Sequence, residues 1–401
     1  MAINSLWAGL ERQPPDSLLA LIGLYAADPR PGKIDLGVGV YKDEAGHTPV
    51  FAAVKAAEQH LLATQATKSY VGPEGDIGFF QRLLPIIFGE DAPVERISGL
   101  QTVGGTGALR MAAELIARAN PEATVHIGAP TWANHPPVIG AARLKVKTHR
   151  HIDLATQSLC FDEIKAALVA AKPGDVALLH GCCHNPTGAD FAPDQWEALA
   201  QLCAEKGVLP FLDLAYQGLG DGLELDAAGI RIMARHCPEL LVAYSCDKNF
   251  GLYRERVGAL YLMARSADEA KLAQTNMLSL ARANWSMPPD HGAATVRIIL
   301  ESEELSRQWR DELDEMRLRI NGMRSDLAAL HPALGFLMQQ KGMFSTFNIT
   351  PDQVAMLREQ CGVYMAPSGR IAICGLTPAN LKPFAAALLE CKVLGSVEAI
   401  A

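Results

Sequence analysis

Three short apolar runs in the middle of the chain each end in polar residues of the kinds that carry out chemistry. The runs with their polar residues are 176–179 with His180 and Asn185, 209–212 with Asp213 and Tyr216, and 240–243 with Ser245 and Lys248. In an open α/β sheet, ligands bind outside the carboxyl ends of the strands. We therefore expect these side chains to meet at one edge of a sheet. A polar turn would explain any single run, but the three together favour a functional site.

A glycine cluster adds a candidate phosphate site. Gly104, Gly105 and Gly107 follow the apolar run 100–103 and precede a helical pattern at 108–119. Exposed amides at a helix N-terminus can bind phosphate. An arginine stands where a dinucleotide fingerprint needs its third glycine, which disfavours a dehydrogenase. The chain has no P-loop, HExxH or CxxC motif, so we expect no metal site. Pyridoxal phosphate (PLP), which combines one phosphate, an aromatic ring and a need for lysine, is the expected cofactor.

The elements that would position these residues alternate along the chain. Between residues 102 and 262, apolar runs alternate with helical stretches such as 193–206, which is typical of an α/β domain on a largely parallel sheet. The spacing of apolar residues predicts further helices at 17–27, 301–330, 351–360 and 381–394, and a strand at 370–374.

Chain length indicates more than one domain. A chain of 401 residues exceeds what a single hydrophobic core usually supports. We predict an N-terminal arm with part of a small domain at 1–48, a large cofactor-binding domain at 49–310 and a small C-terminal domain at 311–401.

Composition excludes several classes of partner and compartment. Hydrophobic residues make up 49% of the chain and charged residues 20%, as in ordinary globular proteins. The net charge of −8 and the lack of a basic run argue against nucleic-acid or membrane binding and favour a small-molecule substrate. The odd number of cysteines, nine, and the adjacent pair Cys182 and Cys183 indicate reduced thiols, so we expect a cytoplasmic protein. The N-terminus lacks the basic and apolar segments of a secretion signal.

Seven motifs, in order along nearly the whole chain, resemble those of class I aminotransferases. They lie at 37–41, 104–110, 184–188, 213–218, 248–253, 256–258 and 368–370. The chain is most similar to bacterial aspartate and aromatic-amino-acid (tyrosine-type) aminotransferases. These are PLP fold-type I enzymes with a mainly parallel sheet in the large domain and a smaller α/β domain. The resemblance implies a homodimer with shared active sites.

The resemblance implies roles for the residues around the cofactor ring. Lys248 would hold PLP covalently and move a proton, and Asp213 would pair with the ring nitrogen. Tyr216 and Asn185 would hydrogen-bond the phenolic oxygen. The remaining cofactor residues would be Trp132 stacked on the ring, His135 behind Asp213, and Gly105, Thr106, Ser245, Arg256 and Tyr70 on the phosphate, with Tyr70 coming from the other subunit.

The resemblance also implies how substrate would bind. Arg370 would pair with the α-carboxylate, because an arginine in a mostly apolar strand needs a partner. Gly39, Trp132 and Asn185 would assist it. Arg282 would reach across the dimer to the distal carboxylate of a dicarboxylic acid. The simpler alternatives are an N-cap for Asp213, core packing for Trp132 and a surface position for Arg282.

Four positions depart from the family's usual residues. Asp247 stands where serine usually precedes the lysine; pointing inward it would add a carboxylate beside the lysine, and pointing outward it would change nothing. Gly104 replaces a frequent serine. Met287 and Thr346 replace an asparagine and an aromatic residue, and they indicate a more apolar pocket that suits aromatic substrates.

The function predicted by these motifs is ping-pong transamination. The amino group of an aromatic L-amino acid (phenylalanine or tyrosine) or of L-aspartate would pass to 2-oxoglutarate. A strict aspartate aminotransferase, a PLP lyase or decarboxylase on the same scaffold, and a non-catalytic PLP-binding protein are the alternatives.

Overall fold

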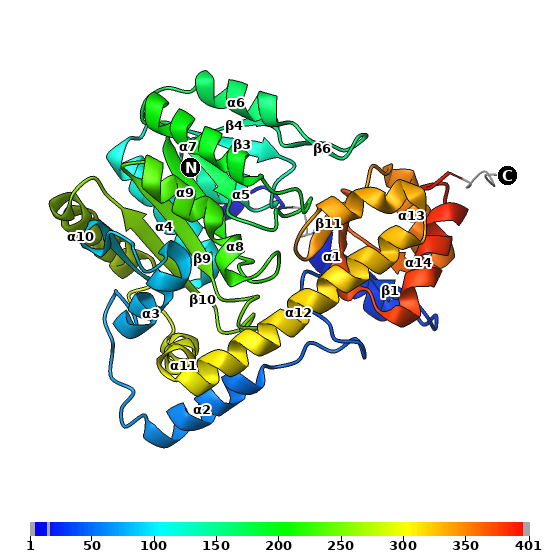
Figure 1. Ribbon diagram of the computed structural model, residues 1–401, viewed down its shortest axis with the longest axis horizontal. Helices are drawn as coiled ribbons and strands as arrows, with labels where there is room; N and C mark the ends of the chain where they lie inside the picture. The colour runs from blue at the N-terminus through cyan, green and yellow to red at the C-terminus, as the bar shows by residue number, and fades with distance from the viewer. Residues whose placement is uncertain (1–4, 14–16, 396–401) are drawn as a thin grey trace.

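The computed structural model describes residues 5–13 and 17–395 and contains a larger and a smaller lobe (Figure 1). The larger lobe is built on a seven-stranded sheet. In spatial order its strands are β2 (Ile97–Val103), β10 (Val257–Met263), β9 (Leu240–Ser245), β8 (Leu209–Leu214), β7 (Val176–His180), β3 (Thr124–Ala129) and β4 (Lys145–Arg150). The three apolar runs of the sequence are therefore adjacent strands.

Strand direction determines which side chains share an edge of the sheet. All neighbouring strands are parallel except that β10 runs antiparallel to both β2 and β9. The carboxyl ends of β2, β7, β8 and β9 thus lie at the same edge as the amino end of β10. This confirms the predicted mainly parallel α/β sheet.

The sheet is buried on both faces, which explains its continuous apolar strands. Val176 and Leu178 of β7 belong to a core with Leu109, whereas Ala177 and Leu179 belong to a second core with Trp196. Alternate residues of one strand therefore pack against helices on opposite faces. The first core includes α4 (Gly104–Ala119), α5 (His135–Ala141) and α10 (Ala267–Asn284), and the second includes α3 (Ile77–Phe88), α6 (Phe161–Val169), α7 (Pro193–Lys206) and α9 (Ala228–His236).

The smaller lobe joins segments from both ends of the chain. β1 (Ile34–Asp35) pairs in parallel with β12 (Val363–Tyr364), and β11 (Phe344–Thr346) pairs antiparallel with β13 (Arg370–Ala372). The helices of this lobe are α1 (Ser17–Ala27), α13 (Pro351–Cys361) and α14 (Pro378–Glu390).

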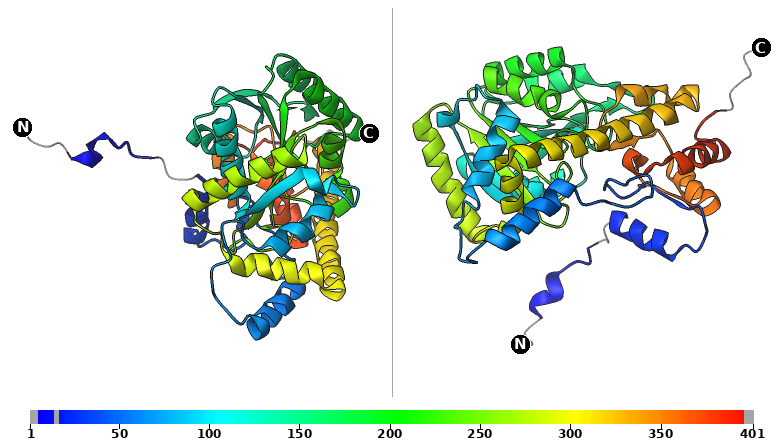
Figure 2. Two further views of the ribbon diagram at one scale, coloured as in Figure 1. Left: turned by 90° about the vertical axis from the view of Figure 1, so that its left-hand side faces the viewer. Right: turned by 60° about the horizontal axis from the view of Figure 1, so that its bottom comes forward.

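One long helix runs between the lobes. Figure 1 shows α12 (Glu303–Ala329) extending from beside α2 (Ala52–Thr64) and α11 (Asp290–Glu301) to the smaller lobe. The predicted boundary between residues 310 and 311 lies inside this helix, and the division into domains stays a prediction. The N-terminal segment, which includes a 3-10 turn at Leu6–Gly9, projects away from the rest of the chain (Figure 2).

The predicted elements are present, with some differences at their ends. The helices predicted at 17–27 and 193–206 have those bounds. The helix predicted at 108–119 begins at Gly104, so the glycine cluster forms its first turn. The helix predicted at 301–330 begins at Glu303, because the Ser302 hydroxyl accepts from Leu305 N at 3.2 Å and caps it. The strand at 370–374 ends at Ala372, and α14 ends at Glu390.

The helices of the described residues include none with the length and apolar character needed to cross a membrane.

Gly258 is a position where the sheet accepts no side chain. Its added Cβ would lie 2.7 Å from the carbonyl oxygens of both Gly104 and Tyr244, and both contacts are with backbone. We expect Gly258→Ala to destabilise the protein by about 1–3 kcal/mol in urea unfolding, because β10 and the first turn of α4 must separate. Gly322→Ala in α12, where nothing lies within 4 Å of the added atom, should be neutral or stabilise by about 1 kcal/mol. Equal stability of the two variants would contradict this account.

Candidate active site

A cavity of about 160 Å³ lies at the carboxyl edge of the large sheet. It contains the polar residues that end β7, β8 and β9, the first turn of α4 and the residue before β10. The residues that line it are Gly105, Thr106, Leu109, Trp132, His180, Asn185, Asp213, Ala215, Tyr216, Ser245, Asp247, Lys248 and Arg256. The predicted convergence of amide, carboxylate, phenol, hydroxyl and amine is therefore present.

Lys248 lies on a loop that is fixed by contacts with α12 and β9. Trp309 of α12 donates to the Asn249 carbonyl at 2.7 Å and stacks on Phe250 with ring centroids 4.3 Å apart. Asn249 also donates to the Tyr244 hydroxyl at 2.8 Å. Burial lowers the pKa of Lys248 below its usual value, although nearby carboxylates oppose the shift. The loop thus presents an amine that loses its proton more readily than an exposed lysine does.

Asp213 lies near the carboxyl end of β8, a central strand of the sheet, and belongs to a chain of hydrogen-bonded side chains. His135 Nε2 lies 2.9 Å from one Asp213 carboxylate oxygen, and His135 Nδ1 lies 2.8 Å from the Thr131 hydroxyl. That hydroxyl is 3.2 Å from His180 Nε2. Burial would raise the pKa of Asp213, but the hydrogen bond from His135 and the charge of Lys248 lower it. Asp213 is therefore held as a carboxylate in a buried position.

The two groups predicted for the phenolic oxygen contact each other. Asn185 Nδ2 donates to the Tyr216 hydroxyl at 3.0 Å. The Lys248 ammonium nitrogen lies 5.0 Å from the centre of the Tyr216 ring. Burial raises the pKa of Tyr216, so the phenol keeps its proton and can donate it in a hydrogen bond.

The first turn of α4 lies against the Arg256 guanidinium at one end of the cavity. Gly104 has a φ of +65°, and a Cβ there would lie 2.5 Å from Arg256 Nη2. The positive φ favours glycine at this position, and a side chain there would require the guanidinium to shift. An added Cβ at Gly105 would lie 2.9 Å from the Ser245 Cβ, so that turn and the end of β9 are also in close contact. Amides, a hydroxyl and a guanidinium at one end of a cavity suit a phosphate.

Asp247 points into the same end of the cavity. Its Oδ2 accepts from Arg256 Nη1 at 2.7 Å, and it lines the cavity together with Lys248. Of the two orientations left open by the sequence, the structure has the inward one. Its carboxylate contacts the arginine and not the lysine amine.

Arg370 lies beside the cavity and not on its wall. Its Nη2 donates to the Gly37 carbonyl at 2.7 Å, and its guanidinium lies 4.6 Å from the centre of the Phe344 ring. Phe344 in turn meets Tyr216 edge to face at 5.9 Å. A Cβ on Gly39 would lie 2.8 Å from the same Phe344 ring, so glycine is required there too.

Comparison with known proteins identifies the family. The model for aminotransferases of class I and II matches residues 31–388. The chain belongs to this family. A tyrosine aminotransferase from Rhizobium meliloti is 49% identical over 379 residues, which are 94% of this chain and 97% of that protein. An aspartate aminotransferase from Salmonella typhi is 45% identical over 393 residues, covering 96% and 99%.

Solved structures agree with this family assignment. A crystal structure described as an aromatic-amino-acid aminotransferase from Burkholderia pseudomallei covalently bound to pyridoxal phosphate has a TM-score of 0.94 to this chain. The two are 38% identical, and the match covers 98% of this chain and 100% of the other. The predicted family and the predicted aminotransferase fold are confirmed.

Two residues that the aminotransferase resemblance assigns to the site lie away from the cavity. Tyr70 is 91% exposed and is not among the residues that line the cavity. Arg282, on α10, is exposed and hydrogen-bonds the Ser286 hydroxyl. His135, Gly39 and Arg370 are also outside the wall, but they contact residues close to it. Within one chain, the residues that the resemblance assigns to the cofactor ring and phosphate therefore lie in or next to the cavity, with the exception of Tyr70.

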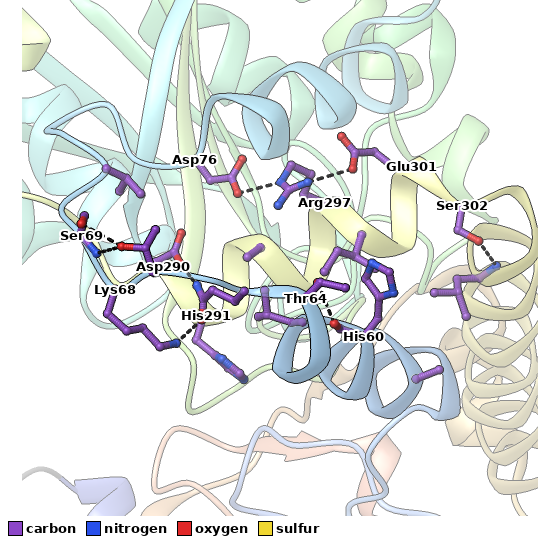
Figure 3. Close-up of a pocket in the computed structure, with 18 of the residues that line it drawn as sticks. His60, Thr64, Lys68, Ser69, Asp76, Asp290, His291, Arg297, Glu301 and Ser302 are labelled. Carbon is purple, nitrogen blue, oxygen red and sulfur yellow. Dashed lines mark hydrogen bonds and ion pairs between the residues drawn. The ribbon is translucent and has the colours of Figure 1, made fainter.

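A larger hollow of about 970 Å³ lies on the face formed by α2, α11 and α12 (Figure 3). Lys68, Ser69 and Met287 line it, whereas Lys248 and Asp213 do not. Thr346 is buried elsewhere, with its hydroxyl donating to the Pro186 carbonyl at 2.9 Å. The smaller cavity is the candidate active site because it alone of the two contains the lysine and its carboxylate partner.

Four residues that line the cavity were given no role in the predicted site: Leu109, His180, Ala215 and Asp247, although His180 was expected at this edge and Asp247 was noted as a departure from the family's usual residue. His180 had a usable signal, because it ends its strand β7 as Ser245 ends β9. Leu109 and Ala215 are apolar, and nothing in their sequence context distinguishes them from core residues.

Buried histidines beneath the site predict a loss of stability in acid. His151 stacks on His184 at 3.7 Å, and His184 lies 4.2 Å from His180. Burial lowers the pKa of His180 to about 3 and that of His151 to about 4, so the unfolded chain binds more protons below pH 6.5. Stability should therefore fall as pH drops from about 6.5 to about 4, by up to about 1.4 kcal/mol per pH unit for each histidine.

Urea unfolding of the cofactor-free protein at pH 7.5, 6.5 and 5.5 measures this slope. His151→Phe keeps an aromatic ring on His184 and removes one titrating group, so its slope between pH 6.5 and 5.5 should be shallower. Parallel slopes for the variant and the parent protein would show that His151 does not contribute.

Proposed function

We propose that this chain is a PLP-dependent transaminase that moves the amino group of an aromatic L-amino acid or L-aspartate to 2-oxoglutarate by a ping-pong mechanism. The observation that carries the proposal is the meeting of Lys248, Asp213 and Arg256 in one cavity of about 160 Å³. A PLP-dependent transaminase needs a lysine, a carboxylate and a cation close together, because PLP carries an aldehyde that reacts with the amine, a ring nitrogen and a phosphate.

The polar groups of the cavity fit PLP. Asp213 uses one carboxylate oxygen for His135, and within residues 5–13 and 17–395 its other oxygen and the Lys248 amine have no hydrogen-bond partner. They are free for the ring nitrogen and the reactive carbon of the cofactor. Gly105, Thr106 and Ser245 offer donors to the phosphate, and Arg256 its guanidinium. PLP, when bound, supplies the electron-withdrawing ring that weakens the bonds to the amino acid's Cα.

The residues of the chain then have distinct tasks. Lys248, with its lowered pKa, accepts and returns the proton at the substrate Cα. Asp213, kept ionised by His135, favours a proton on the ring nitrogen. Tyr216 and Asn185 act together, since they already contact each other, to donate to the phenolic oxygen. Trp132 covers the ring and excludes water.

Arg370 is the proposed site for the substrate α-carboxylate. Its Nε is buried and has no partner in the described part of the chain, while Nη2 is held by the Gly37 carbonyl. A planar guanidinium with a free edge suits bidentate binding of a carboxylate. Gly39, Trp132 and Asn185 would complete this end of the site. The side chain of the substrate would then extend toward the position that Arg282 of a second subunit would occupy.

Both substrate classes are retained because different observations favour each. Arg282 suits a dicarboxylate. Met287 and Thr346 replace the family's usual asparagine and aromatic residue, but neither lines the candidate cavity of this chain, so the case for an aromatic substrate rests on the relatives. The names of the relatives include tyrosine, aromatic-amino-acid and aspartate aminotransferases. A strict aspartate enzyme would reject phenylalanine. A lyase would release ammonia and a decarboxylase carbon dioxide, whereas transamination releases one 2-oxo acid per site without a second substrate.

A homodimer with shared sites is part of the proposal. Tyr70 is 91% exposed and outside its own cavity, so a phosphate-binding role requires that it enter the site of another copy. Lys68, Ser69 and Val71 beside it line the hollow formed with α11 and α12, which we propose as part of the subunit interface (Figure 3). The nine cysteines are all free thiols, which agrees with the proposed cytoplasmic location.

Absorbance spectroscopy tests the cofactor assignment. Purified protein with added PLP should show a visible band that bleaches on adding L-phenylalanine or L-aspartate, and Lys248→Ala should lack this band. Lys145→Ala removes an exposed lysine that pairs with Glu122 and should behave as the parent protein does. If the parent protein shows no visible band even with excess PLP, the proposed function is wrong.

Two arginine variants test the substrate assignment. Arg370→Ala should lower kcat/KM about a hundredfold for phenylalanine and for aspartate alike, because both carry the α-carboxylate. Arg282→Ala should lower kcat/KM for aspartate by a similar factor and leave phenylalanine within a few fold. Steady-state kinetics with both substrates gives the comparison. An Arg282→Ala variant that loses both activities equally would refute the dual-specificity pocket.

A further inference from the structure

The proposed phosphate end of the cavity contains a carboxylate. Asp247 lies between Ser245 and Lys248 in the sequence, and all three line the cavity with the first turn of α4. Its Oδ2 accepts from Arg256 Nη1 at 2.7 Å, and its side chain is 10% exposed. Its Oδ1 is buried and has no hydrogen-bond partner in the part of the chain that the structure describes. A carboxylate of the chain therefore occupies the end of the cavity whose other polar groups suit a bound phosphate.

The contact uses a donor that a bound phosphate would need. Arg256 Nη1 is shared between the Asp247 carboxylate and the Tyr253 carbonyl, which it reaches at 3.1 Å, while Nη2 is the guanidinium nitrogen nearest to the first turn of α4. A phosphate in the cavity would meet an arginine whose charge is already paired. The same carboxylate would remain close to the phosphate, and like charges at short range repel in a buried site.

The other charged groups around Asp247 do not remove this conflict. Lys248 lies next to it in the chain, but its amine is directed toward the Tyr216 ring. Asp213 adds a second negative charge to the cavity. The Arg256 side chain, 38% exposed, is the one cation in contact with the Asp247 carboxylate among the described residues.

Building on the proposed function, we propose that Asp247 lowers the affinity of this site for phosphate by competing for Arg256, so that the cofactor is held loosely and exchanges with free PLP. The same contact holds the Arg256 guanidinium against the first turn of α4. Asp247 is therefore an affinity-determining residue and takes no part in proton transfer.

Inorganic phosphate is the probe that isolates this effect, because it binds without any bond to Lys248. Calorimetric titration of the full-length protein, stripped of cofactor, should give a Kd at least tenfold lower for Asp247→Asn than for the parent protein at the same pH and salt. Asp247→Ser, the family's usual residue, should give the same direction if the asparagine variant folds poorly. Asp314→Asn removes one negative charge from an exposed pair with Arg317 and should leave the Kd unchanged.

The release of PLP gives a second measurement. Loss of the visible band during dilution and gel filtration should be at least tenfold slower for Asp247→Asn than for the parent protein. Equal phosphate affinity in parent and Asp247 variants, or weaker binding in the variants, would overturn the inference; weaker binding would mean that Asp247 orients Arg256 for the ligand. A protein that binds PLP normally with no effect of Asp247 leaves the proposed function standing, whereas failure of every variant to bind PLP refutes the function itself.

Discussion

The burial of Lys248 next to a buried carboxylate is the constraint on which the rest of the site depends. An ammonium removed from water is disfavoured unless it is paired, and the described residues give this one no hydrogen bond. Burial therefore favours the neutral form of the amine, in which it can act as a nucleophile and a base. The pKa of Asp213 is lowered instead, because the His135 hydrogen bond keeps the buried carboxylate ionised. Different neighbours thus give one cavity a reactive amine and a fixed negative charge.

The sequence predicted the parts of this arrangement that follow from periodicity. Apolar runs identify β7, β8 and β9, and the rule that ligands meet the carboxyl ends of parallel strands is enough to bring Asp213, Ser245 and Lys248 together. The direction of β10 could not be read in the same way, since an apolar strand looks alike in either direction. That reversal places Arg256, which precedes β10, beside the first turn of α4.

Side-chain directions in loops also lay beyond the sequence. Arg256 has a φ of +54°, an uncommon conformation for a residue with a side chain, and its contact with Asp247 depends on that local geometry. The chain from His135 through Thr131, four residues earlier, reaches His180, which lies 49 residues from Thr131 in the sequence. Motif resemblance supplied His135 but gave no reason to connect it with the other two. The spacing of residues in the sequence identifies those that reach one edge of the sheet. Only the packing of the folded chain decides which of their side chains contact one another.

The helix α12 contacts parts of both lobes that carry proposed site residues. Near its start, Trp309 donates to the Asn249 carbonyl and fixes the loop that carries the lysine. Near its end, Arg324 donates to the carbonyls of Gly342 and Phe344 at 2.7 and 2.9 Å. Phe344 belongs to the strand paired with β13, whose first residue is the proposed carboxylate-binding arginine. One continuous helix therefore contacts both the loop that carries Lys248 and the strand pair that carries Arg370, so the two proposed halves of the site share one support.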